Sequence, residues 1–404
     1  MSITNEGYQL INKYINIFSF FNENDQINKK YIKQLYENVQ YSIEYLNSYN
    51  FKENVYKKNI EVNDKNREEI INKMGVKLLS SYNSKHIPND IKKVIKVCEY
   101  SFDIYKINFN ISFLILKKED ERILDNYLKI MIKNLHFLIK FKGISINSIK
   151  FIILLSNAKK EKNENKRLVL DATNINTGVT IACQKDGFIF LYRKEELIKV
   201  FIHEVIHSMC IDFADVSINN KMIKTLKEMF NVKSDFRINE AYTEFWANII
   251  NTLFISAEIS ESNFNNFYEN FIFLNMIEKI FAMHQLVSVL DYMSLTYEDL
   301  INKVNTHKYQ EKTNIFAYFI LKCIWLVNSK FFFKYMLDLN NGLITANSNT
   351  KNFYKLVAKT KNYYKNKKFL KLYYKIQKKY IKLSKKYDYD NIKNSLRMSI
   401  LEQN

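Results

Sequence analysis

The chain has 404 residues, of which 47% are hydrophobic and 25% are charged. This balance is that of a globular protein, so extensive disorder is excluded, and the length is enough for one large domain or two or three ordinary ones without disulfide support. Six glycines and one proline exclude collagen-like and Gly-rich architectures, and no two glycines stand close enough to form a phosphate-binding loop.

The formal net charge of +19 is concentrated near the end of the chain. Residues 351–390 contain fourteen lysines against two aspartates, and tyrosines are interleaved with the lysines. An AT-rich coding bias explains much of the lysine excess, and on that interpretation the segment is an amphipathic helix whose lysines are solvated. The other interpretation is weak contact of residues 351–390 with nucleic acid or another acidic surface.

The four cysteines are far apart in the sequence and form no CxxC pair. This spacing argues against a disulfide framework and favours a reducing compartment. The N-terminal residues lack the basic start and long apolar run of a signal peptide, and no uninterrupted stretch of about 18 apolar residues occurs. We therefore expect a soluble cytoplasmic protein without a membrane span.

Residues 1–145 are expected to be mostly helical. Apolar residues recur at helical spacing in residues 28–50 and 124–139. Pro88 stands where a helix would begin, and the apolar residues of 91–98 continue a 3.6-residue period. These patterns predict a helical N-terminal region with polar loops between its helices.

The pattern changes after residue 145. Four short apolar runs predict strands: residues 148–156, 168–171, 178–184 and 188–193. The last two flank a turn that contains Gly187 and predict a β-hairpin. From residue 194 the chain is helical in pattern almost to its end, and the acidic pair Glu195 and Glu196 suits the first turn of a helix.

These elements predict an α+β, predominantly helical fold in which a small mixed sheet leads into a central helix. We expect three regions: a helical N-terminal region of residues 1–145, a domain of residues 146–350 that contains the sheet and the central helix, and a basic Lys/Tyr-rich helical segment of residues 351–404 that packs on or extends this domain. The junction between the sheet and the helix carries the residues with the clearest chemistry.

The helix that follows the hairpin carries the sequence H-E-x-x-H. His203 and His207 are four residues apart, so both imidazoles leave the same face of the helix. Glu204, about 100° further round, can reach over the same site. Two histidines at this spacing bind Zn²⁺, with the glutamate as general base toward a water on the metal. The alternative is a histidine pair that only packs, which is disfavoured because polar groups on an apolar helix need partners.

A third metal ligand must come from outside this helix. Asp212 and Asp215 stand just past it and are candidates. Glu240 and Glu244 are better candidates, because two carboxylates four residues apart on a helix repel each other unless each has a cation or a strong donor. On this interpretation Glu240 is the third ligand and Glu244 accepts a hydrogen bond from Nδ1 of His203. The alternative is a pair of solvated surface glutamates.

The segment N-E-A-Y-T-E-F, residues 239–245, resembles the N-E-A-x-[ST]-[DE] segment of the thermolysin-like zinc peptidases, the gluzincins. The resemblance covers residues 195–213 and 237–250, and the strand-hairpin before them is similar to the zincin layout. It implies a zincin-like catalytic domain, a zinc cofactor and peptide-bond hydrolysis, with Glu240 as the third ligand and Glu244 supporting the first histidine. The two motifs are further apart than in the thermolysin type, and thermolysin-type calcium sites are not recognisable.

Residues 176–212 are also similar to metallopeptidases of large cytoplasmic DNA viruses, whose AT-rich coding suits the composition of this chain. This resemblance implies a viral protein, located in the host cytoplasm or in the virion. It implies the same hydrolase class, a zinc metalloprotease, as the gluzincin resemblance does.

Peptide hydrolysis needs further groups around the metal. A peptide substrate can lie antiparallel to an edge strand, for which Gly178 and Thr180 are the candidates, with Gly178 allowing close approach of the backbone. A tyrosine or histidine that donates to the oxyanion is expected from the C-terminal half, and we rank Tyr318 ahead of His307 and His284. Arg397 is a candidate clamp for a substrate carboxylate.

Two functions from different classes stay open. The first is zinc-dependent hydrolysis of a peptide or protein substrate. The second is a catalytically inactive zincin-like scaffold or structural protein that associates with nucleic acid through its basic C-terminal segment. Both share the metal, and they differ in whether Glu204 matters.

Overall fold

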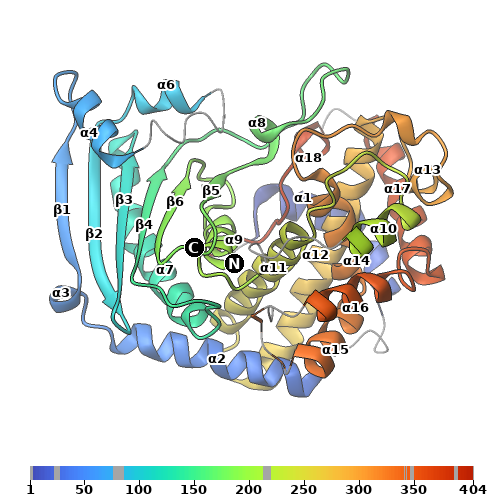
Figure 1. The fold of residues 1–404 in the computed structure, drawn as a ribbon, viewed down its shortest axis with the longest axis horizontal. Helices are drawn as coiled ribbons and strands as arrows, with labels where there is room; N and C mark the ends of the chain where they lie inside the picture. The colour runs from blue at the N-terminus through green and yellow to red at the C-terminus, as the bar shows by residue number, and fades with distance from the viewer. Residues whose placement is uncertain are drawn as a thin grey trace.

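The computed structural model describes residues 3–21, 28–75, 86–212, 220–340, 342, 344–345, 350–385 and 390–403. A mixed β-sheet forms one side of the molecule and a large body of helices forms the other, as Figure 1 shows. The predicted α+β, predominantly helical fold class is therefore confirmed. The helix that carries H-E-x-x-H, α9 (Leu197–Ser208), lies where the sheet and the helical body meet.

The sheet contains six strands among the described residues, in the order β1-β2-β3-β4-β6-β5. Their bounds are Tyr56–Glu61 (β1), Lys96–Ile104 (β2), Ile107–Ile115 (β3), Ser148–Leu154 (β4), Gly178–Thr180 (β5) and Asp186–Leu191 (β6). β3, β4 and β6 run parallel to one another, whereas β1, β2 and β5 pair with their neighbours in antiparallel fashion. The short β5 forms one edge, and its partner β6 leads into α9.

The two faces of the sheet are buried in separate hydrophobic cores. One set of alternating residues, represented by Phe109, faces the larger core, to which α7 (Leu124–Ile139) and α9 contribute. The other set, represented by Leu114, faces a smaller core with residues from α4 (Arg67–Met74) and α6 (Ile87–Ile91). The sheet is thus a middle layer, and α9 is held between the sheet and the helical body.

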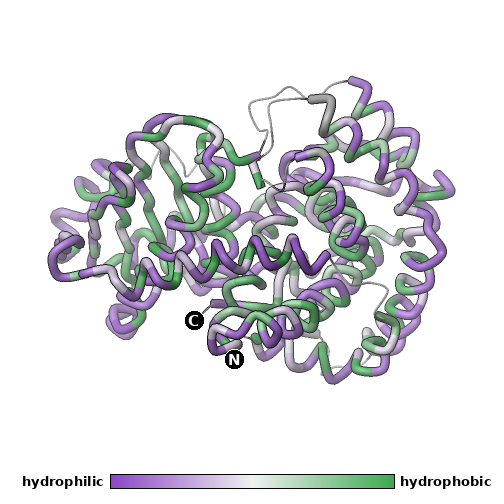
Figure 2. The backbone as a smooth tube through the Cα atoms, turned by 90° about the horizontal axis from the view of Figure 1, so that it is seen from below, coloured by the Kyte–Doolittle hydropathy of each residue, from purple (hydrophilic) through white to green (hydrophobic). Residues whose placement is uncertain are grey.

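Two long helices form the centre of the helical body. α11 (Ile238–Glu258) packs against α9, and α12 (Phe264–Tyr292) packs against α11, with most of their residues buried. The remaining helical elements are α1 (Asn5–Tyr14), η1 (Ile15–Phe20), α2 (Lys29–Ser48), α3 (Phe51–Asn54), η4 (Lys118–Ile123), α8 (Ala172–Ile175), α10 (Asn220–Met229), α13 (Tyr297–Asn302), η5 (Thr306–Lys308), the π-helix η6 (Phe316–Leu321), α14 (Lys322–Val327), α15 (Ser329–Asn340), α16 (Thr350–Thr360), α17 (Lys367–Leu383) and α18 (Asp390–Asn394). Figure 2 shows hydrophobic residues along the strands and inner helices and hydrophilic residues along the outer helices.

By length and composition alone, α12 is long and apolar enough to cross a membrane. Among the described residues a second candidate arises if the bent helix pair of residues 316–327 and 329–338 counts as one span. Within the most apolar window of α12, 83% of the residues are buried inside the protein. Core helices pass the same test, and α12 packs against α11, α14 and α17.

The expectation of a helical N-terminal region is wrong for half of the sheet, because β1, β2 and β3 all lie within residues 1–145. Of the apolar residues in 91–98, Ile91 ends α6, Val94 and Ile95 lie between the two elements, and Cys98 lies in β2. The β2–β3 hairpin turns at Tyr105 and Lys106, which have positive φ values of 49° and 66°. That turn contains no glycine, so the sequence lacks the usual hairpin signal. Since β3 pairs with β4, residues on both sides of 145 share one sheet.

The predictions after residue 145 are closer to the structure. The predicted strand at 148–156 is β4, and the predicted hairpin is β5 and β6. Its turn differs from the prediction, because β5 ends at Thr180 and Gly187, which was expected in the turn, lies within β6 opposite Ile149. No strand forms at residues 168–171, where the described chain is irregular. The C-terminal segment forms α16, α17 and α18 as expected, and residues 395–403 then run through the interior with most side chains buried.

Candidate metal centre

α9 carries H-E-x-x-H into the interior beside the edge of the sheet. The chain passes from β6 into α9 through Glu196, whose left-handed backbone (φ 58°) turns it from strand to helix. Every residue of α9 is buried. Its apolar residues pack in the larger core, and the face that bears His203 and His207 meets α11.

Three side chains from α9 and α11 converge on one point. The Nε2 atoms of His203 and His207 are 3.1 Å apart, and each lies 3.4 Å from Oε2 of Glu240. Among the described residues, this is the one group of three His, Cys, Asp or Glu side chains that could hold a metal ion. The structure thus brings together the three residues that the sequence predicts as ligands.

The separations within this group fit a tetrahedral metal site. Zinc binds imidazole nitrogen and carboxylate oxygen at about 2.0–2.1 Å, so two ligands of a tetrahedral ion lie about 3.3–3.4 Å apart. The three observed separations of 3.1, 3.4 and 3.4 Å are close to this value. Three protein ligands leave the fourth position open, which is the arrangement of a catalytic rather than a structural zinc site.

Each histidine has a carboxylate next to Nδ1, the ring nitrogen that faces away from the site. Nδ1 of His203 lies 3.0 Å from Oε2 of Glu244, and Nδ1 of His207 lies 2.7 Å from Oδ2 of Asp212. When Nδ1–H donates to a carboxylate, the lone pair of Nε2 faces the opposite side, which here is the site. Asp212 therefore supports a ligand, where the sequence analysis considered it as a ligand itself. The other candidate ligand, Asp215, lies outside the described residues.

Asp212 reaches His207 because the chain reverses direction after α9. Cys210 has a left-handed backbone (φ 54°), and its N–H donates to the carbonyl of His207 at 3.1 Å. The N–H of Cys183, in the loop after β5, donates to the same carbonyl at 3.2 Å. An acidic residue five positions after the second histidine is visible in the sequence, but this reversal is not.

Cys183 and Cys210 form a disulfide, with their Cα atoms 4.6 Å apart. The expectation that the distant cysteines stay unpaired is therefore wrong for this pair, while Cys98 and Cys323 are free and buried as expected. The spacing of the cysteines in the sequence does not indicate this pair, because it is the folded loop after β5 that returns to the end of α9. The disulfide tethers the edge of the sheet to the end of the helix that carries both histidines.

Charges around the site favour a cation at its centre. Burial alone would raise the pKa of Glu240, but His207 and His203 hold that pKa well below its usual range. Burial alone would lower the pKa of His207, but Asp212 and Glu240 raise it well above its usual value. The carboxylates thus favour positive charge at the two Nε2 atoms, which a divalent cation supplies as well as protons do.

Glu204 stands beside the three ligands with its carboxylate unpaired. The residue is 7% exposed, and it makes no hydrogen bond or ion pair with any described residue. Burial raises the pKa of this carboxyl group. With His203, Gly178 and Tyr318 it lines a small pocket at the site. A carboxylate that is buried, unpaired and open to this pocket is suited to act as a general base.

Of the three residues considered for stabilising an oxyanion, the structure brings Tyr318 to the site, whereas His284 is buried on α12 with its Nδ1 3.1 Å from the Tyr14 hydroxyl. The Tyr318 hydroxyl donates to Oε2 of Glu240 at 2.7 Å and accepts from Nδ2 of Asn314 at 3.4 Å. Tyr318 lies on the π-helix η6. Turns of this type are rare in proteins overall, and many of those that occur lie at functional sites. His307 is exposed on η5 and lines a neighbouring cavity of about 670 Å³.

Two expected substrate contacts are already occupied. The Arg397 side chain is 4% exposed, contacts Glu402 and lies 3.4 Å from Glu195, so it cannot clamp a substrate carboxylate as the sequence suggested. The Thr180 hydroxyl donates to the carbonyl of Phe188 at 2.9 Å and is thus used within the sheet. The strand that carries Thr180 is nevertheless the edge strand, as expected.

Comparison with protein-family models, with curated proteins and with solved structures finds no match to this chain. An assignment of function therefore depends on the geometry of the site.

The site also includes one residue that the sequence analysis missed, Lys199, whose Nζ lies 2.6 Å from Oε1 of Glu244. A signal was present, because Lys199 precedes His203 by four residues on the same helical face.

Proposed function

We propose that this protein is a zinc-dependent peptidase with a zincin-like catalytic domain of the gluzincin type. The observation that carries the proposal is the convergence of His203, His207 and Glu240 at separations of 3.1–3.4 Å, with both Nδ1 atoms held by carboxylates. Two histidines and one glutamate with an open fourth position form a common catalytic zinc site, and this ligand set suits zinc better than magnesium or calcium.

The residues around the ligands suit hydrolysis of a peptide bond. Bound zinc supplies a Lewis acid and lowers the pKa of water toward about 7. Glu204 takes a proton from the attacking water on its carboxylate and returns it to the leaving amine nitrogen as the C–N bond breaks. The raised pKa of Glu204 suits both steps, and the Tyr318 hydroxyl is positioned to donate to the oxyanion.

β5 and the neighbouring cavity are candidate binding sites for the substrate. No described strand pairs with the outer edge of β5, so an extended peptide can add there beside Glu204. The cavity of about 670 Å³ begins next to Tyr318 and is lined by Arg237, His307 and Asn314. Arg237 is exposed at the start of α11 and is available to a substrate carboxylate, unlike the buried Arg397.

Metal analysis together with the substitution Glu204→Gln tests this proposal. We expect the wild type to purify with zinc and to cleave peptides, and Glu204→Gln to retain zinc while hydrolysis falls by about 10²–10⁴-fold. His203→Ala is the matched control, since it should lose both zinc and hydrolysis. A zinc-loaded wild type that cleaves no member of a diverse peptide library would exclude the peptidase activity.

A second candidate function is favoured by the outer face of α17. Its buried face holds apolar side chains, whereas exposed lysines cover the other: Lys367, Lys371, Lys375, Lys378 and Lys382. This arrangement supports an inactive zincin-like scaffold that binds nucleic acid through residues 351–390. Tight, salt-sensitive binding of RNA or DNA by a wild type without hydrolytic activity would favour the scaffold.

A further inference from the structure

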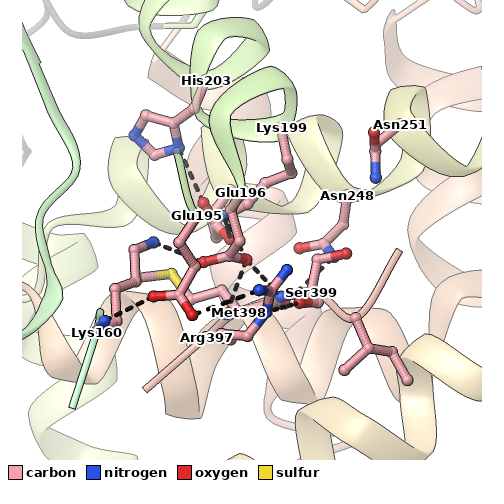
Figure 3. Close-up of polar contacts among 12 residues, drawn as sticks. Lys160, Glu195, Glu196, Lys199, His203, Asn248, Asn251, Arg397, Met398 and Ser399 are labelled. Carbon is pink, nitrogen blue, oxygen red and sulfur yellow. Dashed lines mark hydrogen bonds and ion pairs between the residues drawn. The ribbon is translucent and has the colours of Figure 1, made fainter. Parts of the chain in front are cut away.

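We infer that Lys199 is a positioning residue of the metal site and that it couples the site to the buried segment of residues 395–403. The inference rests on the proposed function, because it concerns the support of the proposed zinc ligands. Figure 3 shows this region, where dashed lines mark polar contacts at His203 on α9 and around Glu196, Met398 and Ser399.

Lys199 and His203 share one carboxylate. Nζ of Lys199 lies 2.6 Å from Oε1 of Glu244, and the other oxygen of Glu244 lies 3.0 Å from Nδ1 of His203. The side chains of Lys199 and Glu244 are 1% and 2% exposed, so water cannot replace either partner. The ammonium group therefore fixes the orientation of the carboxylate that orients the ligand. Burial alone would raise the pKa of Glu244, but Lys199 and His203 hold it far below its usual value.

Glu196 in turn holds Lys199. Its Oε1 lies 3.6 Å from Nζ of Lys199, and its Oε2 accepts a hydrogen bond from Nζ of Lys160 at 2.6 Å. The same Oε1 accepts the backbone N–H groups of Met398 at 3.0 Å and Ser399 at 2.7 Å. Burial alone would raise the pKa of Glu196, but the two lysines lower it to about 2. From the sequence, Glu196 is expected in the first turn of the helix. In the structure its buried carboxylate joins Lys199 to the backbone of residues 398–399.

α11 connects the same two places along one face. Four polar residues follow one another at helical spacing: Glu240, Glu244, Asn248 and Asn251. The first two face the metal site, and the last two donate to the segment. Nδ2 of Asn248 lies 3.3 Å from the carbonyl oxygen of Met398, and Nδ2 of Asn251 lies 3.0 Å from that of Leu401. The helix face that supplies the third ligand thus also holds residues 395–403.

A structural role alone explains this network poorly. Buried ion pairs are often neutral or unfavourable for stability compared with apolar residues of the same size, because each charge loses its hydration. Here the buried charged side chains connect the segment to Nδ1 of His203, a proposed ligand. The orientation of that imidazole and the charge next to it determine metal affinity. Because binding free energies are reciprocal, the seating of residues 395–403 and the binding of zinc should each strengthen the other.

The substitution Lys199→Met tests the inference, with zinc affinity measured by competition with a chelator. Methionine keeps the length of the side chain and removes its charge. We expect zinc affinity to fall about 10–100-fold, the usual effect of losing a group that supports a ligand. Amide exchange gives a second readout: zinc should slow the exchange of the Met398 and Ser399 amides in the wild type and not in the variant.

Lys133→Met is the matched control. Lys133 is 5% exposed, close to the 2% of Lys199, and it pairs with Glu258, but it makes no hydrogen bond or ion pair to Glu244 or to residues 395–403. We expect this variant to lose stability and to keep the zinc affinity of the wild type. Equal loss of zinc affinity in both variants would show a general effect of buried charge and overturn the inference.

Should Lys199→Met not fold, the comparison moves to the background of Glu244→Gln, in which the carboxylate that Lys199 neutralises is gone. Because Lys199 acts through Glu244, the double variant Lys199→Met/Glu244→Gln should bind zinc as tightly as Glu244→Gln alone. A further tenfold loss would overturn the inference. A wild type that binds no zinc overturns the proposed function as well, whereas equal zinc binding by folded Lys199→Met and the wild type overturns the inference alone.

Discussion

A β-carbon added to Gly178 would lie 2.8 Å from Oε1 and 2.9 Å from Cγ of Glu204, so the edge strand leaves room for this carboxylate because residue 178 is glycine. The same β-carbon would lie 2.7 Å from Cδ2 of Leu191 in the neighbouring strand. The backbone of β5 therefore limits where the proposed general base can stand. A peptide added to β5 would present its backbone to Glu204 at a distance that the strand itself determines.

Gly178→Ala should damage hydrolysis without damaging the metal site. The added methyl group displaces Glu204, and a displacement near 1 Å can reduce kcat/KM by about 100-fold. Zinc affinity should stay unchanged, because the atoms nearest to the added β-carbon belong to Glu204 and Leu191 and not to the three proposed ligands. Gly75→Ala is the control: its β-carbon meets nothing within 4 Å, so its positive φ costs stability and leaves kcat/KM intact. Loss of zinc from Gly178→Ala would contradict this explanation.

Asp212→Asn should weaken zinc binding by about 10–100-fold, because Asp212 is the partner of Nδ1 of His207 at 2.7 Å. The amide keeps the shape of the side chain and removes the negative charge that favours a cation at the site. Chelator competition measures the effect. Asp171→Asn, at the N-cap of α8, makes the same chemical change away from the site and should leave the zinc affinity as it is. Equal zinc affinity of Asp212→Asn and the wild type would show that Asp212 does not support the ligand.

The sequence predicts the proposed ligands but not all of the residues that support them, and the reason is physical. His203, His207, Glu240 and Glu244 lie on two helices, where the 3.6-residue period predicts which side chains share a face. Asp212 depends on a chain reversal at Cys210, a residue that adopts left-handed backbone without being glycine. Arg397 is 202 residues from Glu195, and no local pattern indicates that these two residues meet in the interior.

The fold, like the site, could be predicted from the sequence only in part. β4 has a strong local signal, namely a β-branched run. Gly187 indicates the hairpin before α9 from the sequence, although in the structure it lies within β6 and not in the turn. β2 and β3 carry a signal that the prediction of a helical region overlooked, because apolar and polar residues alternate in C-E-Y-S-F-D-I (98–104) and in I-N-F-N-I-S-F (107–113). What the sequence lacks is a glycine turn between these strands, since the hairpin turns at Tyr105 and Lys106.

The disulfide predicts a measurable redox dependence of stability. Cys183 and Cys210 are 27 residues apart, and closing such a loop stabilises a fold by about 3.5 kcal/mol in the chain-entropy model. We expect a dithiol reductant, or Cys183→Ser, to lower the free energy of unfolding by about 2–4 kcal/mol. Under denaturing, non-reducing conditions two thiols should react, those of Cys98 and Cys323. Four reactive thiols would show that the pair is not bonded in the isolated protein.

Glu278 predicts how stability depends on pH. Its carboxylate accepts hydrogen bonds from Asn248, Ser399 and the N–H of Ile400, and burial raises its pKa from 4.5 to about 7. The folded protein therefore holds this proton more tightly than the unfolded chain does. The resulting stabilisation is complete below pH 4.5 and is lost as the pH rises to 7.

Glu278→Gln removes this titration and so tests it. The variant loses one good acceptor, since an amide group then faces Nδ2 of Asn248, and at pH 4 it should be less stable than the wild type. As the pH rises from 4.5 to 7, the wild type should lose roughly 3 kcal/mol relative to the variant. Denaturant unfolding of both proteins between pH 4 and 8 measures the difference. Parallel stability profiles would mean that Glu278 titrates at its ordinary pKa and that solvent reaches the end of the C-terminal segment.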